Sequence, residues 1–239
     1  MKTAVVIFPG SNCDQDVIHA VRDTVGCEVN AVWHREEQLP EGTGLVILPG
    51  GFSYGDYLRS GAMAARSPIM GAVKEHAGQG GLVLGICNGF QILTESSLLP
   101  GVLLPNKTLS FICRPCFLSV ENTDTPFTGL FEKGQVVQFP IAHGDGLFFL
   151  PADELNDLEN RGGAVFRYVS PGGVGGDEWN PNGSVNSIAG IVNPQGNILG
   201  LMPHPERASE AILGGEDGRL FWRSVASFLE KGGRRHGLL

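Results

Sequence analysis

Residues 82–89, LVLGICNG, decide the fold, because they join an apolar run to a helical pattern at a cysteine between two glycines. The unbroken run 82–86 predicts a strand buried on both faces, which is typical of a parallel sheet. The residues after Cys87, as far as 98, have the spacing of a helix. The sequence therefore predicts a buried strand that turns sharply into a helix at Cys87.

The same succession of a short apolar strand, a glycine turn and a helix recurs on the N-terminal side. Asn12, with Gln15 three positions later, is typical of a helix N-cap, and Gly78 is typical of a helix end. Strands that alternate with helices predict an α/β fold whose parallel sheet has helices on both faces. The expected strands are 3–8, 27–33 and 45–48, and the expected helices are 12–25 and 69–77.

The pattern becomes less regular after residue 103, where short strands dominate. Residues 151–163 are polar and predict an exposed loop, and the glycine-rich residues 171–184 predict a second long loop. No repeat or linker divides the chain, so we expect one α/β domain over residues 1–239. The expected strands of this part are 117–120, 135–141, 164–169, 188–192 and 198–202, and the expected last helix is 218–231.

Composition excludes several classes of protein. The 239 residues are 42% hydrophobic and 18% charged, which does not fit a disordered chain. A formal charge of −8 argues against a nucleic-acid or anionic membrane surface. No run approaches the roughly 18 apolar residues of a membrane span, and the first apolar run is too short for a signal peptide. Five cysteines, an odd number, fit free thiols in a reducing compartment, so we expect a cytoplasmic protein.

Cys87 has the surroundings of a nucleophile. In the G-x-S-x-G turn of serine hydrolases, the middle residue has a strained backbone and the flanking glycines avoid steric clashes. Gly85 and Gly89 provide the same spacing around a sulfur. The N-terminus of the following helix stabilises a thiolate, the reactive form. An inert buried cysteine is the alternative, and the strand before Cys87 and the helix after it favour the nucleophile.

The other cysteines give weaker signals. Cys113 and Cys116 have C-x-x-C spacing, but no second pair completes a zinc site. Their segment has the pattern of a strand, whereas a redox motif opens a helix. We therefore expect no metal site, and we interpret Cys13 and Cys27 as core residues.

His204 and Glu206 follow the last predicted strand in the sequence PHPE. Proline restricts its neighbour to extended conformations, in which residues i and i+2 point the same way. Glu206 can then accept the Nδ1–H of His204, which leaves Nε2 free to exchange a proton with a thiol. A solvent-exposed turn is the alternative, and the presence of Cys87 favours the catalytic pair. Among the other histidines, only His143 lies in a loop suited to a site.

Acyl chemistry at a cysteine also needs two N–H donors directed at the oxyanion. The N–H of Asn88, directly after the nucleophile, is the first. A glycine turn follows the predicted strand 45–48, and glycine lets a peptide N–H point inward without steric cost. We assign the second donor to Gly51, an assignment that depends on Cys87.

At this point the motifs resemble a known family. GICNGFQ (85–91) together with PHPE (203–206) is similar to the Cys-His-Glu triad of class I, triad-type glutamine amidotransferases. Three longer stretches resemble the glutaminase subunits of phosphoribosylformylglycinamidine synthases. They are FPGSNCD (8–14), PGGFSYGDYLR (49–59) and MPHPER (202–207), so the resemblance covers nearly the whole chain.

The resemblance implies a flavodoxin-like, doubly wound, mostly parallel sheet, and glutamine as the substrate. The loop after His143 departs from the family at Asp145, where glutamate is usual. The roles that the resemblance implies are Cys87 as nucleophile, His204 as acid/base, Glu206 as its orienting partner, Gly51 and Asn88 as oxyanion donors, and Gly50, Gln91 and His143 as substrate-binding residues.

Ammonia released from glutamine needs an acceptor. The chain has neither a G-x-x-x-x-G-K-[ST] phosphate loop nor a dinucleotide fingerprint, so we expect no cofactor in it and a partner synthetase that receives the ammonia. The resemblance implies a large subunit that uses ATP and Mg²⁺ to convert formylglycinamide ribonucleotide to the amidine in purine biosynthesis. It also implies a small third subunit. We expect the isolated chain to be a poor glutaminase that its partner activates.

Two other functions stay open. A γ-glutamyl peptidase or hydrolase of the same fold would use Cys87 and His204 without a partner. A non-catalytic partner protein or thiol sensor would keep the cysteine but would not need Glu206.

Overall fold

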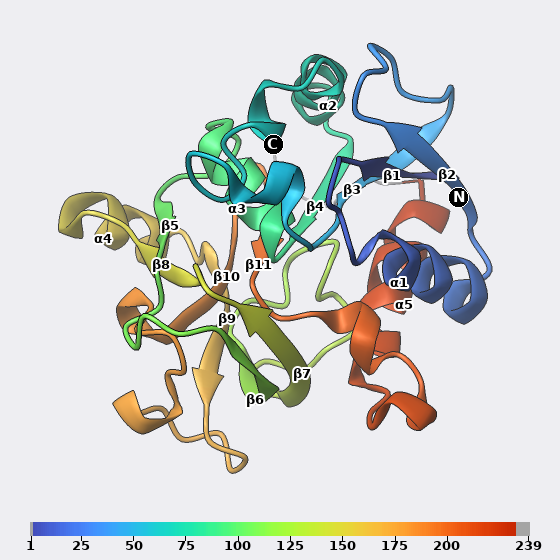
Figure 1. Cartoon of the computed structure of the whole chain (residues 1–239). Helices are drawn as coiled ribbons and strands as arrows, with labels where there is room; N and C mark the ends of the chain where they lie inside the picture. Colours follow the sequence, from blue (N-terminus) through green and yellow to red (C-terminus); the bar gives the residue numbers. More distant parts are fainter. Residues whose placement is uncertain (1, 233–239) are drawn as a thin grey trace.

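The computed structural model describes residues 2–232, with a nine-stranded mixed sheet at the centre (Figure 1). Met1 and residues 233–239 of the predicted domain lie outside the described residues. The strand order is β2-β1-β3-β4-β11-β10-β9-β6-β7, and β5 and β8 form a separate ribbon. The strands are β1 (Lys2–Ile7), β2 (Glu28–Trp33), β3 (Thr43–Leu48), β4 (Leu82–Ile86), β5 (Val102–Leu104), β6 (Ile112–Val120), β7 (Val136–His143), β8 (Leu147–Phe149), β9 (Ala164–Val169), β10 (Ile188–Val192) and β11 (Ile198–Leu201).

The strands β2, β1, β3, β4 and β11 are mutually parallel. Their order is that of a flavodoxin-like sheet, with β11 in the fifth place. Helix α1 (Asp14–His19) connects β1 to β2, and α2 (Ile69–Gly78) connects β3 to β4 in the opposite direction along the sheet. Because parallel crossovers are right-handed, the two helices cover opposite faces. The predicted doubly wound α/β fold is confirmed.

The strands β10, β9, β6 and β7 extend the sheet in antiparallel fashion. Helix α5 (Asp217–Glu230) packs on this part through aromatic side chains. The ring of Phe166 lies 6.3 Å from that of Phe139 on β7 and 6.4 Å from that of Phe221 on α5, measured between centroids. All three rings are fully buried, so these aromatic contacts join β7, β9 and α5 into one packed unit.

The first helix is shorter than predicted. Helix α1 begins at Asp14, with Cys13 in the N-cap position and no side-chain cap, and a π-helical turn follows at Ala20–Thr24. Asn12 is therefore not the cap. A turn in which the Ser11 N–H donates to the Phe8 carbonyl (3.0 Å) keeps the preceding residues out of the helix.

The predicted loop 151–163 is wrong, because it contains helix α4 (Ala152–Asn160). Its polar composition hides a weak apolar stripe, in which Leu155 and Leu158 lie three positions apart. Leu158 is buried in the core, while Asp153 and Glu154 stand in the first turn, where negative charge is favourable. Helix α3 (Asn88–Glu95) ends before residue 98 because the chain turns at Ser97, whose φ is 59°.

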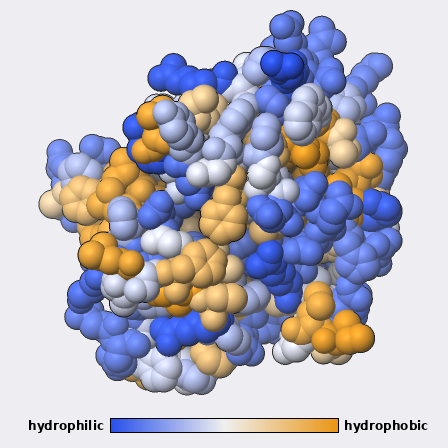
Figure 2. All heavy atoms as spheres, in the orientation of Figure 1, coloured by the Kyte–Doolittle hydropathy of each residue, from blue (hydrophilic) through white to orange (hydrophobic). Residues whose placement is uncertain are grey.

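None of the helices between residues 2 and 232 is both long and apolar enough to cross a bilayer. On the face shown in Figure 2, hydrophilic groups are mixed with apolar clusters. One cluster lies over the β5–β8 ribbon, where Val102, Leu104 and Phe149 are exposed, and another lies over residues 211–213, where Ile212 and Leu213 are exposed.

Candidate active site

Cys87 lies at the junction between β4 and α3, in the strained turn that the glycine spacing predicts. Its φ is 51° and its ψ is −106°, a region that L-residues rarely adopt. A Cβ on Gly89 would lie 1.9 Å from the carbonyl oxygen of Leu48, and a Cβ on Gly85 would lie 2.6 Å from that of Gly89. The turn is anchored to β11, because the Cys87 N–H donates to the Leu201 carbonyl at 2.8 Å.

His204 and Glu206 form a buried pair directly after β11. The Nδ1–H of His204 donates to Oε1 of Glu206 at 2.6 Å, and both side chains are almost inaccessible to solvent. Glu206 belongs to a 3₁₀ turn, Pro205–Ala208, and not to an extended segment as predicted. The His204 N–H donates to the Pro140 carbonyl of β7 at 2.8 Å, so the antiparallel strands hold the histidine in place.

The Cys87 and His204 side chains meet above Gly50. A Cβ on Gly50 would lie 2.8 Å from Cε1 of His204 and 3.4 Å from Cβ of Cys87. Nε2 of His204 makes no hydrogen bond among residues 2–232. Burial by itself lowers the pKa of His204, but the charges of Glu206 and Cys87 raise it to about 10. The imidazolium form is therefore favoured at neutral pH, beside the sulfur of Cys87.

The N–H groups of Gly51 and Asn88, the two predicted oxyanion donors, have no acceptor within the described backbone, for different reasons. Gly51 has a φ of 129°, and a Cβ there would lie 2.4 Å from the Asn12 nitrogen, so only glycine fits. Its N–H donates no backbone hydrogen bond within the described part of the chain. Asn88 is the first residue of α3, where the N–H groups lack intrahelical acceptors. Both N–H groups thus remain available to a ligand near Cys87.

Gln91 takes part in a chain of protein hydrogen bonds. Oδ1 of Asn88 accepts the Ser53 N–H at 3.2 Å, and Nδ2 of Asn88 donates to Oε1 of Gln91 at 2.8 Å. Nε2 of Gln91 donates to the Asp145 carbonyl at 2.6 Å. The chain holds the loops on either side of Cys87 together, and the contact of Gln91 with a substrate stays a prediction.

His143 is buried at the end of β7, with 2% of its surface exposed. Its Nδ1–H donates to Oδ1 of Asn106 at 3.0 Å, because Nδ2 of Asn106 donates to the carbonyls of Ser110 and His143 and so fixes the amide orientation. Burial, with a smaller contribution from nearby His204, lowers the pKa of His143 to about 4. The ring is therefore neutral at pH 7, and its Nε2 is an acceptor that receives no hydrogen bond from the described part of the chain.

A cavity of about 350 Å³, counted with its open mouth, lies beside Cys87. It brings together four of the predicted site residues from both halves of the sheet, namely Gly51, Cys87, Gln91 and His143. The predicted residues Gly50, Asn88, His204 and Glu206 do not line it, and His204 borders an adjoining cavity instead. The residues that line the first cavity are Gly51, Phe52, Asp56, Ser60, Cys87, Gln91, Phe111, Ala142, His143, Gly144 and Asp145.

Cys13 and Arg207 adjoin the His204–Glu206 pair, and sequence reasoning missed them. Nη2 of Arg207 donates to Sγ of Cys13 at 3.0 Å, and Nε donates to Oδ2 of Asp16 at 3.0 Å. Burial and the charge of Glu206 raise the pKa of Cys13 to about 12, so this thiol stays protonated. The signal that could have found Cys13 is its place after the carboxyl end of β1, at the sheet edge where Cys87 also lies.

Among residues 2–232, one group of side chains has the composition of a metal site. Cys13, His204 and Glu206 each offer a ligand atom, and these atoms lie within 4.8 Å of one another. Nδ1 of His204 and Sγ of Cys13 already have protein hydrogen bonds. Of the C-x-x-C pair, Cys113 is exposed on β6, whereas Cys116 is buried and donates to the Phe139 carbonyl.

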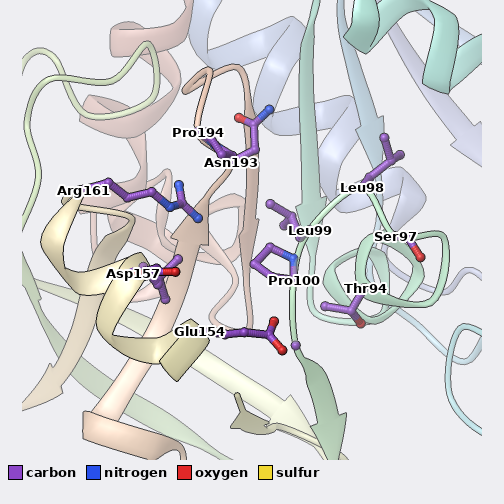
Figure 3. Close-up of a pocket in the computed structure, with 12 residues that line it drawn as sticks. Thr94, Ser97, Leu98, Leu99, Pro100, Glu154, Asp157, Arg161, Asn193 and Pro194 are labelled. Atoms are coloured by element: carbon purple, nitrogen blue, oxygen red, sulfur yellow. The ribbon is translucent and has the colours of Figure 1, made fainter. Parts of the chain in front are cut away.

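A larger groove, about 990 Å³ with its mouth, lies at the other end of α3 (Figure 3). Thr94 and Leu99 border one side, and Glu154, Asp157 and Arg161 border the other. Arg161 donates to the Val192 carbonyl at 3.1 Å. Neither a cysteine nor a histidine is among the described residues that line this groove, so the chemistry assigns the site to the cavity beside Cys87.

Comparisons with known proteins agree with this geometry. The family of CobB/CobQ-like glutamine amidotransferase domains matches residues 1–215. Phosphoribosylformylglycinamidine synthase subunit PurQ of Bradyrhizobium diazoefficiens is 54% identical over 231 residues, which cover 97% of this chain and 99% of that protein. The PurQ subunit of Methanosarcina acetivorans is 54% identical over 229 residues, 96% of this chain and 98% of that protein.

The solved structure of PurLQS from Thermotoga maritima contains a chain of the same fold. The TM-score is 0.84 at 46% sequence identity, and the match covers 95% of this chain and 98% of that chain. The elements described above therefore have the arrangement of a PurQ subunit. The chain belongs to the family of PurQ subunits of phosphoribosylformylglycinamidine synthase, within the CobB/CobQ-like glutamine amidotransferase domains.

Proposed function

We propose that the chain hydrolyses the side-chain amide of glutamine through a thioester on Cys87 and passes the ammonia to a synthetase subunit. One observation carries this proposal: the strained Cys87 turn and the buried His204–Glu206 pair meet above Gly50. Family membership supports the same reaction. We further propose that residues 1–239 act as one glutaminase domain.

In the acylation step, the Cys87 thiolate attacks the amide carbon of glutamine, and the carbonyl oxygen becomes an oxyanion. The N–H groups of Gly51 and Asn88 donate to this oxyanion. Imidazolium His204, held by Glu206, gives its proton to the leaving nitrogen. The C–N bond breaks, ammonia departs, and a γ-glutamyl thioester remains on Cys87.

In the deacylation step, water replaces ammonia as the reaction partner. Neutral His204 takes a proton from water, and the resulting hydroxide attacks the thioester carbon. The same two N–H groups stabilise the second oxyanion. The C–S bond breaks, glutamate is released, and the thiolate–imidazolium pair is restored.

The ammonia that this chain releases is consumed by a partner subunit in a complex. The solved relative is named PurLQS, so we propose a large PurL-type synthetase and a small PurS-type subunit as partners of this chain. The synthetase supplies ATP and Mg²⁺ and makes formylglycinamidine ribonucleotide from formylglycinamide ribonucleotide in purine biosynthesis. A cytoplasmic location belongs to the same proposal, and the five free cysteines support it.

The experiment that tests the proposal is covalent labelling with a diazoketone analogue of glutamine, followed by mass mapping of the modified residue. We expect one adduct on Cys87 and parallel loss of glutamine-dependent synthesis in the reconstituted complex. Synthesis with added ammonium chloride should survive, because it bypasses Cys87. Labelling at Cys13 or Cys113, with Cys87 unmodified, would contradict the proposal.

A second assay separates the proposed function from a γ-glutamyl hydrolase. The purified chain is incubated with glutamine or with γ-glutamyl peptides, with and without its partners. We expect partner-dependent hydrolysis of glutamine and little turnover of peptides. Turnover of γ-glutamyl peptides by the isolated chain, at a rate that its partners leave unchanged, would favour the hydrolase.

A further inference from the structure

The cavity beside Cys87 contains two carboxylates from opposite halves of the molecule. Asp56 comes from the loop after β3, and Asp145 comes from the loop after β7. None of the described residues that line this cavity is a lysine or an arginine. Burial raises the pKa of Asp56, and the negative charge of Asp145 raises it further, so the two carboxylates are close enough to repel each other. Two uncompensated carboxylates destabilise each other, and a cationic group between them would relieve this.

Polar atoms without partners also point to a ligand at this place. Oδ1 of Asp56 is buried and makes no hydrogen bond within residues 2–232. His143, which is 2% exposed and lines the same cavity, has an Nε2 that makes no hydrogen bond with any residue that the structure describes. A buried polar atom without a partner is costly, so two of them beside one cavity indicate that a polar ligand completes the site.

The Asp145 carboxylate is held in position before any ligand binds. Its Oδ2 accepts the Ser60 hydroxyl at 2.6 Å, and its backbone carbonyl accepts Nε2 of Gln91 at 2.6 Å. Ser60 follows Asp56 on the same loop, so this bond joins the two acidic loops. A fixed carboxylate binds a cation better than a mobile one because no ordering is needed on binding.

We propose that Asp56 and Asp145 bind the α-ammonium group of the glutamine substrate. This inference rests on the proposed function, because glutamine carries a single cation, at the end opposite the amide that Cys87 attacks. Cys87, Asp56 and Asp145 line the same cavity, so a glutamine bound there with its amide at Cys87 would have its ammonium group near the two carboxylates. The pair then selects a free amino acid and rejects an amide without an α-ammonium group.

The test compares glutamine with its deamino analogue, glutaramate, in the complex with the partner synthetase. Ammonia release gives kcat/KM for each compound with the wild type, Asp56→Asn and Asp145→Asn. Asparagine keeps the size of the side chain and tolerates the positive φ of position 56. The matched control is Asp157→Asn, which removes an exposed carboxylate from the other groove (Figure 3).

We expect the wild type to prefer glutamine by more than tenfold, and each variant at positions 56 and 145 to lose at least ~10-fold in kcat/KM for glutamine, mostly through KM. The value for glutaramate should change by less than about threefold. The control should keep both values. Alkylation of Cys87 by iodoacetamide, which has no ammonium group, should be equal in all four proteins.

A variant that still rejects glutaramate as strongly as the wild type would overturn the inference and leave the proposed function intact. Failure of the wild-type complex to hydrolyse glutamine would instead contradict the proposed glutaminase function. A rise of Tm on addition of Mg²⁺ or Ca²⁺ alone, absent from Asp56→Asn and Asp145→Asn, would assign the carboxylates to a metal and also overturn the inference.

Discussion

The parallel and antiparallel halves of the sheet contribute to the site in different ways. The parallel half supplies Cys87 and Gly51, each fixed by its own turn directly after a strand. The antiparallel half supplies the Pro140 carbonyl, which holds His204, and the loop that carries Asp145. The nucleophile therefore depends on local backbone geometry, whereas the position of its base depends on contacts between distant segments.

The largest effect is expected from Cys87→Ala, which removes the chemistry of the parallel half and leaves its turn. Glutamine-dependent synthesis should fall by at least ~10⁴-fold, because no other group forms the thioester. Steady-state assays of the complex measure this, and ammonium-dependent synthesis with an unchanged Tm is the control. Residual glutamine turnover within tenfold of the wild type would exclude Cys87 as the nucleophile.

Glu206→Gln tests the base, which the antiparallel half holds in place. Because the charge of Glu206 raises the pKa of His204 to about 10, the imidazolium is kept at neutral pH and lost as pH rises through that value. Without the charge of Glu206, His204 should lose its proton at lower pH, and kcat should fall by at least ~10²-fold. The rate of glutamine hydrolysis from pH 6 to 10.5 checks both effects. An unchanged alkaline limb would refute the role of Glu206.

The raised pKa of His204 also makes the stability of the folded protein depend on pH, because proton binding and folding are linked. The folded pKa of His204 lies above its ordinary value of 6.5, so the stabilisation is complete below pH 6.5 and disappears as pH rises through about 10. The Tm of the wild type should therefore fall more steeply above pH 8 than that of Glu206→Gln. Parallel Tm curves over this range would contradict the linkage.

Gly89→Ala should break the nucleophile turn of the parallel half through sterics alone. The new Cβ would lie 1.9 Å from the Leu48 carbonyl oxygen, and the backbone must move, at a cost of about 3 kcal/mol. Gly71→Ala in α2 is the matched control, because a Cβ there has nothing within 4 Å, and it should stabilise the helix by about 1 kcal/mol. Urea unfolding measures both. Equal stability of the two variants would show that the turn is not tightly packed.

Phe166→Leu is the mildest change and asks whether the two halves unfold together. Removing part of this buried ring should cost about 1–2 kcal/mol, with little effect on alkylation of Cys87 in the folded protein. With Trp33 and Trp179 replaced by phenylalanine, tryptophan fluorescence reports on Trp222 beside Phe221, and far-UV circular dichroism reports on the whole sheet. We expect the two transitions to coincide. Separate transitions would mean that the antiparallel half unfolds on its own.

Predictions from sequence succeeded where the signal was local. The apolar run before Cys87 and the glycines around it specified the strand, the turn and the helix. The contact between His204 and Glu206 was also predicted, but for an extended segment, and the structure makes it from a 3₁₀ turn. Residues two positions apart stay close in either conformation, so the pairing survived an error about the backbone.

Predictions failed where tertiary contacts decided. Helix α4 was missed because its composition is polar and a single leucine, Leu158, is fully buried. Cys13 is buried, as interpreted, but the sequence did not predict that its sulfur lies beside His204 and accepts a hydrogen bond from Arg207. Spacing along the chain contains no information about such neighbours, which are almost 200 positions apart.

The sequence by itself determined the parallel α/β core, the strained turn at Cys87 and the adjacency of His204 and Glu206, because each follows from the sterics of neighbouring residues. Only the tertiary structure decided that Asp56 and Asp145 share a cavity with Cys87, and that the Pro140 carbonyl holds His204. Those contacts arise when the antiparallel strands pack beside the parallel ones, which buries aromatic surface and brings distant loops to one edge of the sheet.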